Sequence, residues 1–432
     1  MILSSTKNSN LKASLEEAIF RSLPADNGLY MPDHIPQLSG AFIDTIQDRT
    51  FNEIAVEVSK TLFGNIISTA NITRIIERAF DFDAPTIALD DHTHVLELFH
   101  GPSMAFKDFG ARFMASIMSY FLEESQKEIH VLVATSGDTG GAVAQGFFNL
   151  PNVKVTILYP SGKVSDIQEK QLTTLGHNVT ALEINGTFDD CQLLVKQAFL
   201  DHQLNQKFNL ASANSINIAR LIPQSFYYFR AYAQVKAQGL PVVFSIPSGN
   251  YGNLSAGLLA QKMGLPVGHF VAATNQNDVV PRYLINGKYE PLSSVETISN
   301  AMDVGNPSNF VRLIRFFEDD WSQVRKHITG FSFTDDQTRV AIAHIAHQHN
   351  YIVCPHTAVA YLGWKEFQAQ QSSPSVGVFL ATAHPAKFLD VVDNAVGYQT
   401  PIPNRLSELL NKHKQSIVMN TQFSSFKNYL LS

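Results

Sequence analysis

Short runs of apolar residues recur along most of the chain, separated by longer segments in which apolar residues have helical spacing. Six of these runs are rich in Val, Ile, Leu, Phe and Ala: residues 128–135, 153–160, 178–184, 241–247, 269–274 and 375–382. Continuous apolar strands that alternate with helices are typical of a parallel sheet covered on both faces. The pattern therefore predicts an α/β fold of the open, doubly wound kind, whose ligands bind at the carboxyl ends of the strands.

Two of the predicted helices carry recognisable start signals. Ser165 precedes a helical segment with Gln168 three residues later, which is the spacing of a capping box. Gly176 is expected to end that helix, because glycine readily adopts the left-handed backbone that follows a last turn. Thr187 stands in the same relation to the helix that follows it.

The chain has 432 residues, which is enough for two or three domains with a large buried core. The first ninety or so residues are predicted to be helical and mixed, with a turn-rich loop at 23–38, and the region after residue 400 to be helical and peripheral. The first twenty residues lack the apolar core of a signal peptide, and no apolar run reaches the roughly 18 residues that span a bilayer. We therefore expect a cytoplasmic protein.

The formal net charge is −6. This argues against a general nucleic-acid or anionic-membrane binder, because both need a basic face. It does not exclude anionic small molecules, which need only a local group of donors. Cys191 and Cys354 lie far apart and match no zinc or disulfide pattern, so we expect reduced thiols in the core.

Two predicted strand-to-helix junctions combine glycines with hydroxyl and amide side chains. They are residues 135–140 (TSGDTG) and 248–253 (SGNYGN). Glycines let the backbone approach a ligand closely and turn N–H groups toward an anion at a helix N-terminus. Each loop could simply be a tight turn. Neither contains an NTPase P-loop or a dinucleotide fingerprint, so a phosphate without a nucleotide is the ligand that they favour.

Lys107 lies in the apolar stretch ELFHGPSMAFKDFGARF, between Phe106 and Asp108. A lysine with a reference pKa near 10.4 is protonated and a poor nucleophile, whereas burial among Phe and Met lowers that pKa. A Schiff-base lysine with a phosphate-binding loop elsewhere is what pyridoxal phosphate requires. From this stretch alone, a lysine whose stem packs while its ammonium reaches water is the more frequent case.

A third group of donors lies in the stretch ASANSINIARL, which contains Asn214, Ser215, Asn217 and Arg220. An arginine with nearby amides suits a second phosphate or a carboxylate. An exposed helix start with a surface arginine is an equally good interpretation of this stretch by itself. The co-occurrence of the lysine, the two glycine loops and this cluster carries more weight than any one of them.

Other candidate sites are weaker. The histidines within residues 344–349 have no carboxylate in the same segment, so no metal site is predicted. Residues 92–94 (HTH) are expected to form a loop before a strand. Cys354 and His356 are sequence neighbours, whereas catalytic Cys–His pairs meet through the fold. No G-x-S-x-G elbow occurs, and a kinase or NTPase is excluded by the lack of a P-loop.

Taken together, the motifs resemble those of threonine synthase, a pyridoxal-phosphate enzyme of fold type II (the tryptophan synthase β family). The resemblance runs through nearly the whole chain, in the order NGLYMP, LFHGPSMAFKDFGARF, ATSGDTGGAVA, LASANSINIAR, IPSGNYGN, NAMDVGNPSNF and TAHPAKF. It implies two doubly wound open sheets with helices on both faces, plus a mainly helical N-terminal region. It also implies three segments: residues 1–95, residues 96–240 with the lysine and substrate loop, and residues 241–432 with the cofactor-phosphate loop.

The resemblance further implies a reaction and roles for single residues. The reaction would convert O-phospho-L-homoserine and water to L-threonine and phosphate. Lys107 would hold pyridoxal phosphate as a Schiff base and move protons at Cα and Cβ of the substrate, and Thr382 would hydrogen-bond the pyridine nitrogen. The cofactor phosphate would be bound by Gly249, Asn250, Tyr251, Gly252 and Asn253. The substrate carboxylate or phosphate would be bound by Thr135, Ser136 and Thr139, and the departing phosphate by Asn214, Ser215 and Arg220.

Three positions depart from the family pattern. Ser103 replaces a more usual Thr and keeps the hydroxyl, and Tyr251 replaces a more usual Phe. Asp138 stands where other fold-type-II branches have Asn beside the cofactor 3′-oxygen, and its role is left open. A serine or threonine dehydratase and a non-catalytic pyridoxal-phosphate-binding relative are the alternatives. The expected partner is the small-molecule substrate, with no nucleic acid or membrane, in a monomer or homodimer.

Overall fold

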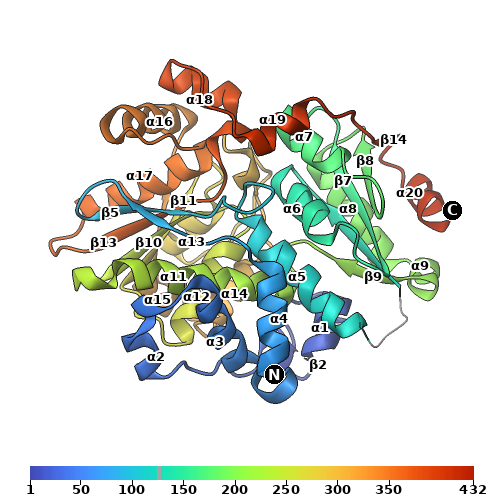
Figure 1. The fold of residues 1–432 in the computed structure, drawn as a ribbon, viewed down its shortest axis with the longest axis horizontal. Helices are drawn as coiled ribbons and strands as arrows, with labels where there is room; N and C mark the ends of the chain where they lie inside the picture. The colour runs from blue at the N-terminus through green and yellow to red at the C-terminus, as the bar shows by residue number, and fades with distance from the viewer. Residues whose placement is uncertain (124–127) are drawn as a thin grey trace.

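The computed structural model describes residues 1–123 and 128–432, and its strands form two open sheets and a small N-terminal sheet (Figure 1). Helices surround both open sheets, which confirms the predicted α/β architecture. The six apolar runs predicted as strands are all strands, with ends that differ from the prediction by at most one residue.

The larger sheet has six strands in the order β12-β11-β10-β13-β5-β4, parallel except for β4 at one edge. Its strands are β4 (Thr86–Ala88), β5 (Thr93–Glu97), β10 (Val242–Pro247), β11 (His269–Thr274), β12 (Ile328–Ser332) and β13 (Val376–Ala381). Successive side chains point to opposite faces. Val243 packs with Trp364 on one face, whereas Phe244 packs with Tyr228 on the other, their rings 4.9 Å apart. Both faces are therefore buried.

The smaller sheet has five parallel strands in the order β14-β8-β7-β6-β9. Its strands are β6 (Ile129–Ala134), β7 (Val153–Pro160), β8 (Val179–Ile184), β9 (Asn209–Ser212) and β14 (Ile417–Met419). Val131 and Val155 join the largest core cluster, whereas Leu132 and Leu158 pack on the opposite face with Leu194. This alternation explains why its central strands are continuous apolar runs.

The N-terminal region is helical and mixed, as predicted. Its three strands form an antiparallel sheet in the order β2-β1-β3. The elements are β1 (Ile2–Ser5), β2 (Lys12–Ser14), α1 (Leu15–Arg21), β3 (Tyr30–Pro32), α2 (Gly40–Asp44), α3 (Phe51–Phe63) and α4 (Thr69–Ala79). Helix α4 packs on α5 at the front of the view in Figure 1.

The remaining helices connect the strands or cover the sheets. The first eight are α5 (Lys107–Leu122), α6 (Asp138–Phe147), α7 (Asp166–Thr173), α8 (Phe188–Leu200), α9 (His202–Lys207), α10 (Ile218–Leu221), α11 (Phe226–Val235) and α12 (Gly252–Lys262). The others are α13 (Val279–Asn286), α14 (Phe310–Arg315), α15 (Trp321–His327), α16 (Asp335–His349), α17 (Pro355–Ala369), α18 (Leu389–Val396), α19 (Asn404–Leu410) and α20 (Phe423–Leu431).

Local signals of the sequence are largely confirmed. Ser165 and Thr187 both form capping boxes, at the starts of α7 and α8. Gly176 has a positive φ of 66°, but α7 already ends at Thr173, so the glycine lies beyond the helix and not at its cap. Cys191 and Cys354 are free and buried.

Two expectations about local structure are wrong. Residues 93 and 94 do not form a loop but begin β5, where Thr93 accepts a hydrogen bond from the Trp364 indole at 3.1 Å. The polar Thr93 and His94 concealed the start of this strand, which pairs with β13. The region after residue 400 is not only helical and peripheral, because β14 pairs with β8 and extends the smaller sheet.

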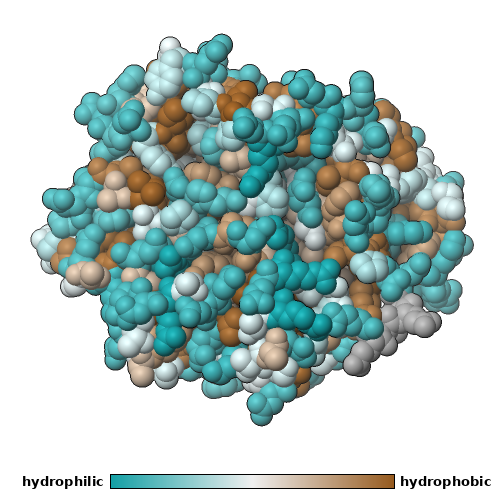
Figure 2. Space-filling model, in the orientation of Figure 1, coloured by the Kyte–Doolittle hydropathy of each residue, from teal (hydrophilic) through white to brown (hydrophobic). Residues whose placement is uncertain are grey.

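The sheets do not follow chain order, since β5 joins strands of the last two hundred residues and β14 joins strands of the middle of the chain. The three predicted domain segments stay a prediction. Figure 2 shows a surface on which hydrophilic residues predominate and apolar residues lie in separate small patches. Among the helices of residues 1–123 and 128–432, none is long and apolar enough to cross a membrane.

Candidate active site

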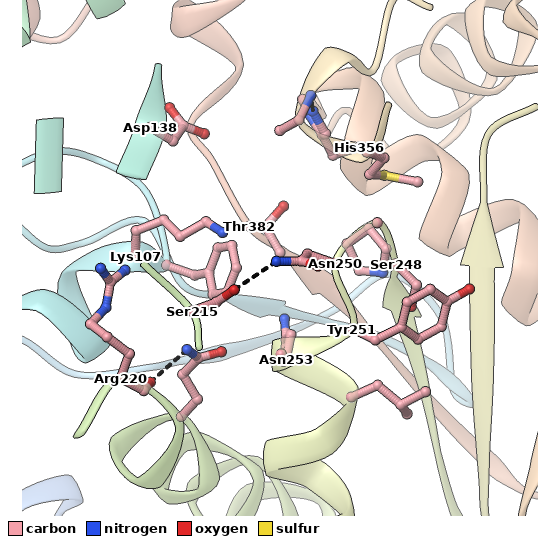
Figure 3. Close-up of a pocket in the computed structure, with 18 residues that line it drawn as sticks. Lys107, Asp138, Ser215, Arg220, Ser248, Asn250, Tyr251, Asn253, His356 and Thr382 are labelled. Atoms are coloured by element: carbon pink, nitrogen blue, oxygen red, sulfur yellow. Dashed lines mark hydrogen bonds between the residues drawn. The ribbon is translucent and has the colours of Figure 1, made fainter. Parts of the chain in front are cut away.

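The candidate site lies where the carboxyl ends of strands from both sheets meet, as expected for open α/β sheets. The chain segments after β5, β6, β9, β10 and β13 all contribute residues to one pocket. These segments carry, in that order, Lys107, Asp138, Ser215, Asn250 and Thr382 (Figure 3). Residues far apart in the sequence thus share one cavity because each follows the end of a parallel strand.

Lys107 is the first residue of α5, and backbone pairing fixes it beside Thr382. The N–H of Phe106 donates to the carbonyl of Thr382 at 2.8 Å, and Ala105 forms an antiparallel bridge with Ala383. Figure 3 shows the Lys107 amine and the Thr382 hydroxyl directed into the same cavity. A lysine on a rigid helix start, anchored to a strand end, is held in one position.

The surroundings of Lys107 favour its neutral form. Burial and the nearby Arg220 guanidinium lower the pKa of its amine, Asp138 opposes both effects, and the resulting pKa is about 8. The ammonium also lies 4.6 Å from the centre of the Phe106 ring. A lysine with this pKa is a much better nucleophile at neutral pH than a surface lysine, as a reaction with an aldehyde requires.

The loop after β10 presents donors to the pocket at the start of α12. The amide oxygen of Asn253 accepts hydrogen bonds from the hydroxyls of Tyr227 at 2.7 Å and Tyr228 at 2.6 Å. These bonds fix the amide and direct its Nδ2 group, which is buried and has no partner among the described residues. An orphaned buried donor at a helix N-terminus fits a phosphate.

The backbone of this loop adopts conformations that bring it close to its neighbours. Tyr251 has a positive φ of 58°, in the left-handed region, immediately before α12. A Cβ atom on Gly249 would lie only 2.6 Å from the Cα of Met302. The loop is therefore a tight cradle that a side chain at Gly249 would disrupt.

A second group of donors lines the same pocket. Arg220 is buried, donates to the carbonyl of Ala213, and has an Nε–H without a partner among the described residues. Gly110 makes room for it, because a Cβ there would lie 2.7 Å from the Arg220 Nε. The Ser215 hydroxyl accepts from the amide of Asn250 at 2.8 Å (Figure 3).

Asp138 faces the same pocket as an anion with a cationic partner. Its carboxylate lies 2.5 Å from the Lys387 ammonium and accepts a bond from the Gln168 amide at 3.0 Å. Burial raises the pKa of Asp138, but the Lys387 charge and these hydrogen bonds outweigh it and hold the pKa below its ordinary value. Lys387 also donates to the carbonyl of Ser103 at 3.0 Å.

His356 completes the wall of the pocket. Its Nε2 accepts the N–H of Ala301 at 3.2 Å, so its other ring nitrogen carries the hydrogen and faces the Cys354 sulfur at 3.8 Å. Burial lowers the pKa of His356 to about 4, which makes the ring neutral at physiological pH. The histidine therefore supports the segment that packs on Gly249.

Three family models match this chain. The model described as "Pyridoxal-phosphate dependent enzyme" covers residues 91–382, "Threonine synthase N terminus" covers residues 3–80, and "Threonine synthase, C-terminal" covers residues 357–430. The threonine synthase of Haemophilus influenzae is 42% identical over 439 residues, with 100% of both chains covered. The chain belongs to the threonine synthase family.

Solved structures agree with this assignment. The crystal structure of threonine synthase from Escherichia coli has a TM-score of 0.93 and 40% identity, and the match covers 100% of this chain and 99% of that one. The pyridoxal-phosphate-bound threonine synthase from Brucella melitensis has a TM-score of 0.92 and 34% identity, with 100% and 98% coverage. The chain is a pyridoxal-phosphate-dependent lyase of fold type II with the threonine synthase function.

The structure brings together many of the residues predicted for the threonine synthase site. The pocket is lined by Lys107, Ser215, Arg220, Gly249, Asn250, Tyr251, Gly252, Asn253 and Thr382. These residues surround one cavity with an amine, two groups of anion donors and a hydroxyl. Their individual roles stay predictions.

Four predicted residues do not line this pocket. Thr135 is buried, and its hydroxyl accepts the N–H groups of Gly137 and Gly140 at 2.9 Å, so it shapes the loop from within. Ser136 and Thr139 lie at the same loop, partly exposed. The Asn214 amide donates to the carbonyl of Ala134 at 2.8 Å, which joins the ends of β9 and β6.

Sequence reasoning missed several residues that contact the pocket or its lining. Lys387 lies within the quoted stretch TAHPAKF, but nothing in the stretch indicates that it pairs with Asp138. His356 was considered only as a partner of Cys354. Asn309 and Arg312, which contact Ser215, lie in or just after the stretch NAMDVGNPSNF. Their contacts depend on tertiary structure that no local pattern records.

Proposed function

We propose that this threonine synthase converts O-phospho-L-homoserine and water to L-threonine and inorganic phosphate in the pocket around Lys107. The observation that carries the proposal is one pocket lined by a buried amine and by two neighbouring groups of anion donors, the loop at the start of α12 and the pair Ser215 and Arg220. One group is suited to the phosphate of the cofactor and the other to the phosphate of the substrate. An enzyme whose substrate has no phosphate has no need for the second group.

The residues present fit pyridoxal phosphate. Asn253 and the backbone of residues 249–252 would hold its phosphate at the start of α12, where the helix dipole favours an anion. Thr382 would accept or donate a hydrogen bond at the pyridine nitrogen, and Lys107 would bind the aldehyde carbon. When bound, the cofactor accepts electrons and thereby stabilises negative charge at the carbon atoms beside the substrate nitrogen.

The second donor group would bind the substrate phosphate. Arg220 offers its Nε–H, which has no partner among the described residues, and Ser215 offers a hydroxyl that Asn250 orients. Lys107, once released from the cofactor, would take the proton from Cα and then a proton from Cβ, because phosphate leaves from Cγ. Its pKa of about 8 suits a group that must both accept and return protons near neutral pH.

The oligomeric state, the location, the domain segments and some substrate contacts are also proposals. The substrate is a small molecule, and we propose a monomer or homodimer that acts without nucleic acid or membrane. A cytoplasmic location and the domain segments 1–95, 96–240 and 241–432 are likewise proposed. The predicted contacts of Thr135, Ser136, Thr139 and Asn214 with substrate would need movement of their loops, since they do not line the pocket around Lys107.

The purified enzyme, loaded with pyridoxal phosphate, is expected to release phosphate from O-phospho-L-homoserine and to form threonine, identified by chromatography. Lys107→Ala should abolish both products, whereas Lys196→Ala, an exposed lysine on α8, should leave them unchanged. Arg220→Ala should retain the cofactor but lose turnover. Keto acid and ammonia formed from serine or threonine, without phosphate release from the phosphorylated substrate, would contradict the proposal.

A further inference from the structure

Arg312 on α14 is completely buried, yet it does not line the pocket. Its guanidinium donates four hydrogen bonds, three of them to backbone carbonyls. They go to Ser215 at 3.1 Å, Ile216 at 2.7 Å, Tyr30 at 3.1 Å and the Asn309 amide oxygen at 2.8 Å. Two of these acceptors lie in the segment that carries the proposed anion donors.

None of these acceptors is a carboxylate. Within residues 1–123 and 128–432, Arg312 forms no salt bridge, and burial alone lowers the pKa of its guanidinium, to about 9. The group therefore stays protonated at neutral pH. A buried cation is costly unless it is paired or hydrogen-bonded. Neutral oxygens accept four of the five guanidinium hydrogens without cancelling the charge, and the Nε–H has no partner among the described residues. A positive charge thus remains next to the backbone of Ser215 and Ile216.

The Arg312 contacts continue to the pocket through two side chains. Asn309 accepts from Arg312 and donates its amide hydrogen to the Ser215 hydroxyl oxygen at 3.2 Å. Asn250 donates to the same oxygen at 2.8 Å, and its own amide oxygen accepts the N–H of Ser308 at 2.6 Å. Ser215 is therefore held by Asn309 and Arg312 directly, and by Asn250, which Ser308 fixes in turn.

This arrangement determines what the Ser215 hydroxyl can offer. Two amide donors occupy the lone pairs of its oxygen, so its hydrogen has to be donated elsewhere. Ser215 lines the pocket, which leaves the cavity as the direction in which an acceptor can lie. A phosphate oxygen is such an acceptor, and bonds from neutral donors to an anion are strong where water is excluded.

We propose that Arg312 is a positioning residue of the anion site. It orients Ser215 through Asn309 and leaves the site with an uncompensated positive charge that favours a phosphate. The inference rests on the proposed function, because it assigns this charge to the phosphate of the substrate and of the product. Arg312 itself touches neither molecule.

Asn309→Asp is the sharpest test, because it keeps the size of the side chain, gives Arg312 a carboxylate partner and removes the hydrogen bond that Asn309 donates to Ser215. The holoenzyme is used, so that the cofactor already occupies its own phosphate site, and inorganic phosphate is the probe. Its dissociation constant is measured from protection against thermal unfolding and from competitive inhibition. We expect it to rise at least about tenfold, with the cofactor content unchanged. KM should rise more than kcat falls.

The matched control is Asn71→Asp in the first turn of α4, which adds the same charge outside the pocket lining. It should leave the dissociation constant of inorganic phosphate unchanged. Arg312→Met is the second variant, measured at low temperature because the loss of four hydrogen bonds destabilises the fold. It too should bind phosphate at least about tenfold more weakly.

The possible outcomes separate the inference from the proposed function. Wild-type affinity for phosphate in Asn309→Asp or in Arg312→Met would overturn the role of Arg312 and leave the proposed reaction intact. Failure of the wild-type holoenzyme to bind phosphate or to release it from O-phospho-L-homoserine would instead overturn the proposed function.

Discussion

Two of the buried cations around the pocket, Lys387 and Arg312, differ in whether an anion balances their charge. Lys387 lies 2.5 Å from the Asp138 carboxylate, so its charge is balanced by an anion at the same place. Arg312 contacts only neutral oxygens, and its charge is not balanced within the described residues. The first pair lies on the Asp138 side of Lys107, and the second cation lies behind Ser215.

The difference indicates what each side of the pocket is built to bind. A balanced pair keeps a carboxylate ionised without adding net charge near Lys107. The pKa of Lys107 can therefore stay near neutral pH. An unbalanced cation creates a field that attracts an anion. This explains how a protein with a net charge of −6 can bind a phosphorylated substrate. The local charge around the site matters more than the net charge.

The largest expected effect comes from breaking the balanced pair. Lys387→Met leaves the Asp138 carboxylate buried without its cation, which should lower the free energy of unfolding by about 3–5 kcal/mol. The double variant Lys387→Met/Asp138→Asn removes both charges and should recover a large part of that loss. Urea denaturation of the apoprotein measures both values. Equal losses in the single and the double variant would show that the two charges do not interact.

The balanced pair should also control the protonation of Lys107. Asp138→Asn removes an anion that favours the ammonium, so the pKa of Lys107 should fall below about 8, by about one pH unit. The double variant Lys387→Met/Asp138→Asn loses one charge of each sign, so its Lys107 pKa should be close to the wild-type value. The measurement is the pH dependence of the rate at which the apoprotein takes up pyridoxal phosphate.

The same pKa predicts how the stability of the apoprotein depends on pH. The Lys107 pKa is about 8 in the folded protein and near 10.5 in the unfolded chain. Between these values the unfolded chain binds more protons, so stability should rise as the pH rises from 8 toward 10.5. The rise should be smaller in Lys107→Met. A stability that falls over this interval in wild type but not in Lys107→Met would contradict the sign.

Two glycines of the proposed cofactor-phosphate loop differ in the space that a side chain would find. Gly249→Ala places a Cβ 2.6 Å from the Met302 backbone, whereas Gly252→Ala meets its nearest atoms at 3.5 Å. The first should weaken pyridoxal-phosphate binding at least about tenfold and the second much less. Fluorescence titration of the apoprotein measures both. A weaker effect at Gly249 than at Gly252 would show that the loop does not cradle the cofactor.

The sequence was sufficient for the features that are local. Apolar runs predicted the six strands because both faces of each are buried, and the capping residues predicted the starts of α7 and α8. Lys107 could be recognised because an amine among aromatic residues is unusual. The loop at 248–253 could be recognised because it is rich in glycine. Each feature is visible in a short stretch of sequence. Such features need no knowledge of the fold.

The features that could not be predicted depend on residues far apart in the sequence. Asp138 and Lys387 are separated by about 250 residues, and the role of Asp138 was left open because no local pattern names its partner. Arg312 resembles any arginine on a short helix until its carbonyl partners are known. The polar start of β5 and the short β14 were missed because sheet pairing, not their own composition, makes them strands.

The smallest expected effect tests whether the cap of α7 helps to hold the pair of Lys387 and Asp138. Ser165 and Thr187 form equivalent capping boxes, but the Ser165 hydroxyl also donates to the Lys387 carbonyl at 3.1 Å. Ser165 also positions Gln168, which donates to Asp138. Thr187→Ala should cost about 1 kcal/mol, the usual value of a cap. Ser165→Ala should cost about 1 kcal/mol more, from the additional hydrogen bond, as measured by urea denaturation. If the two costs are equal, the cap of α7 contributes nothing to the position of Lys387, and the pair with Asp138 is held by its own contacts alone.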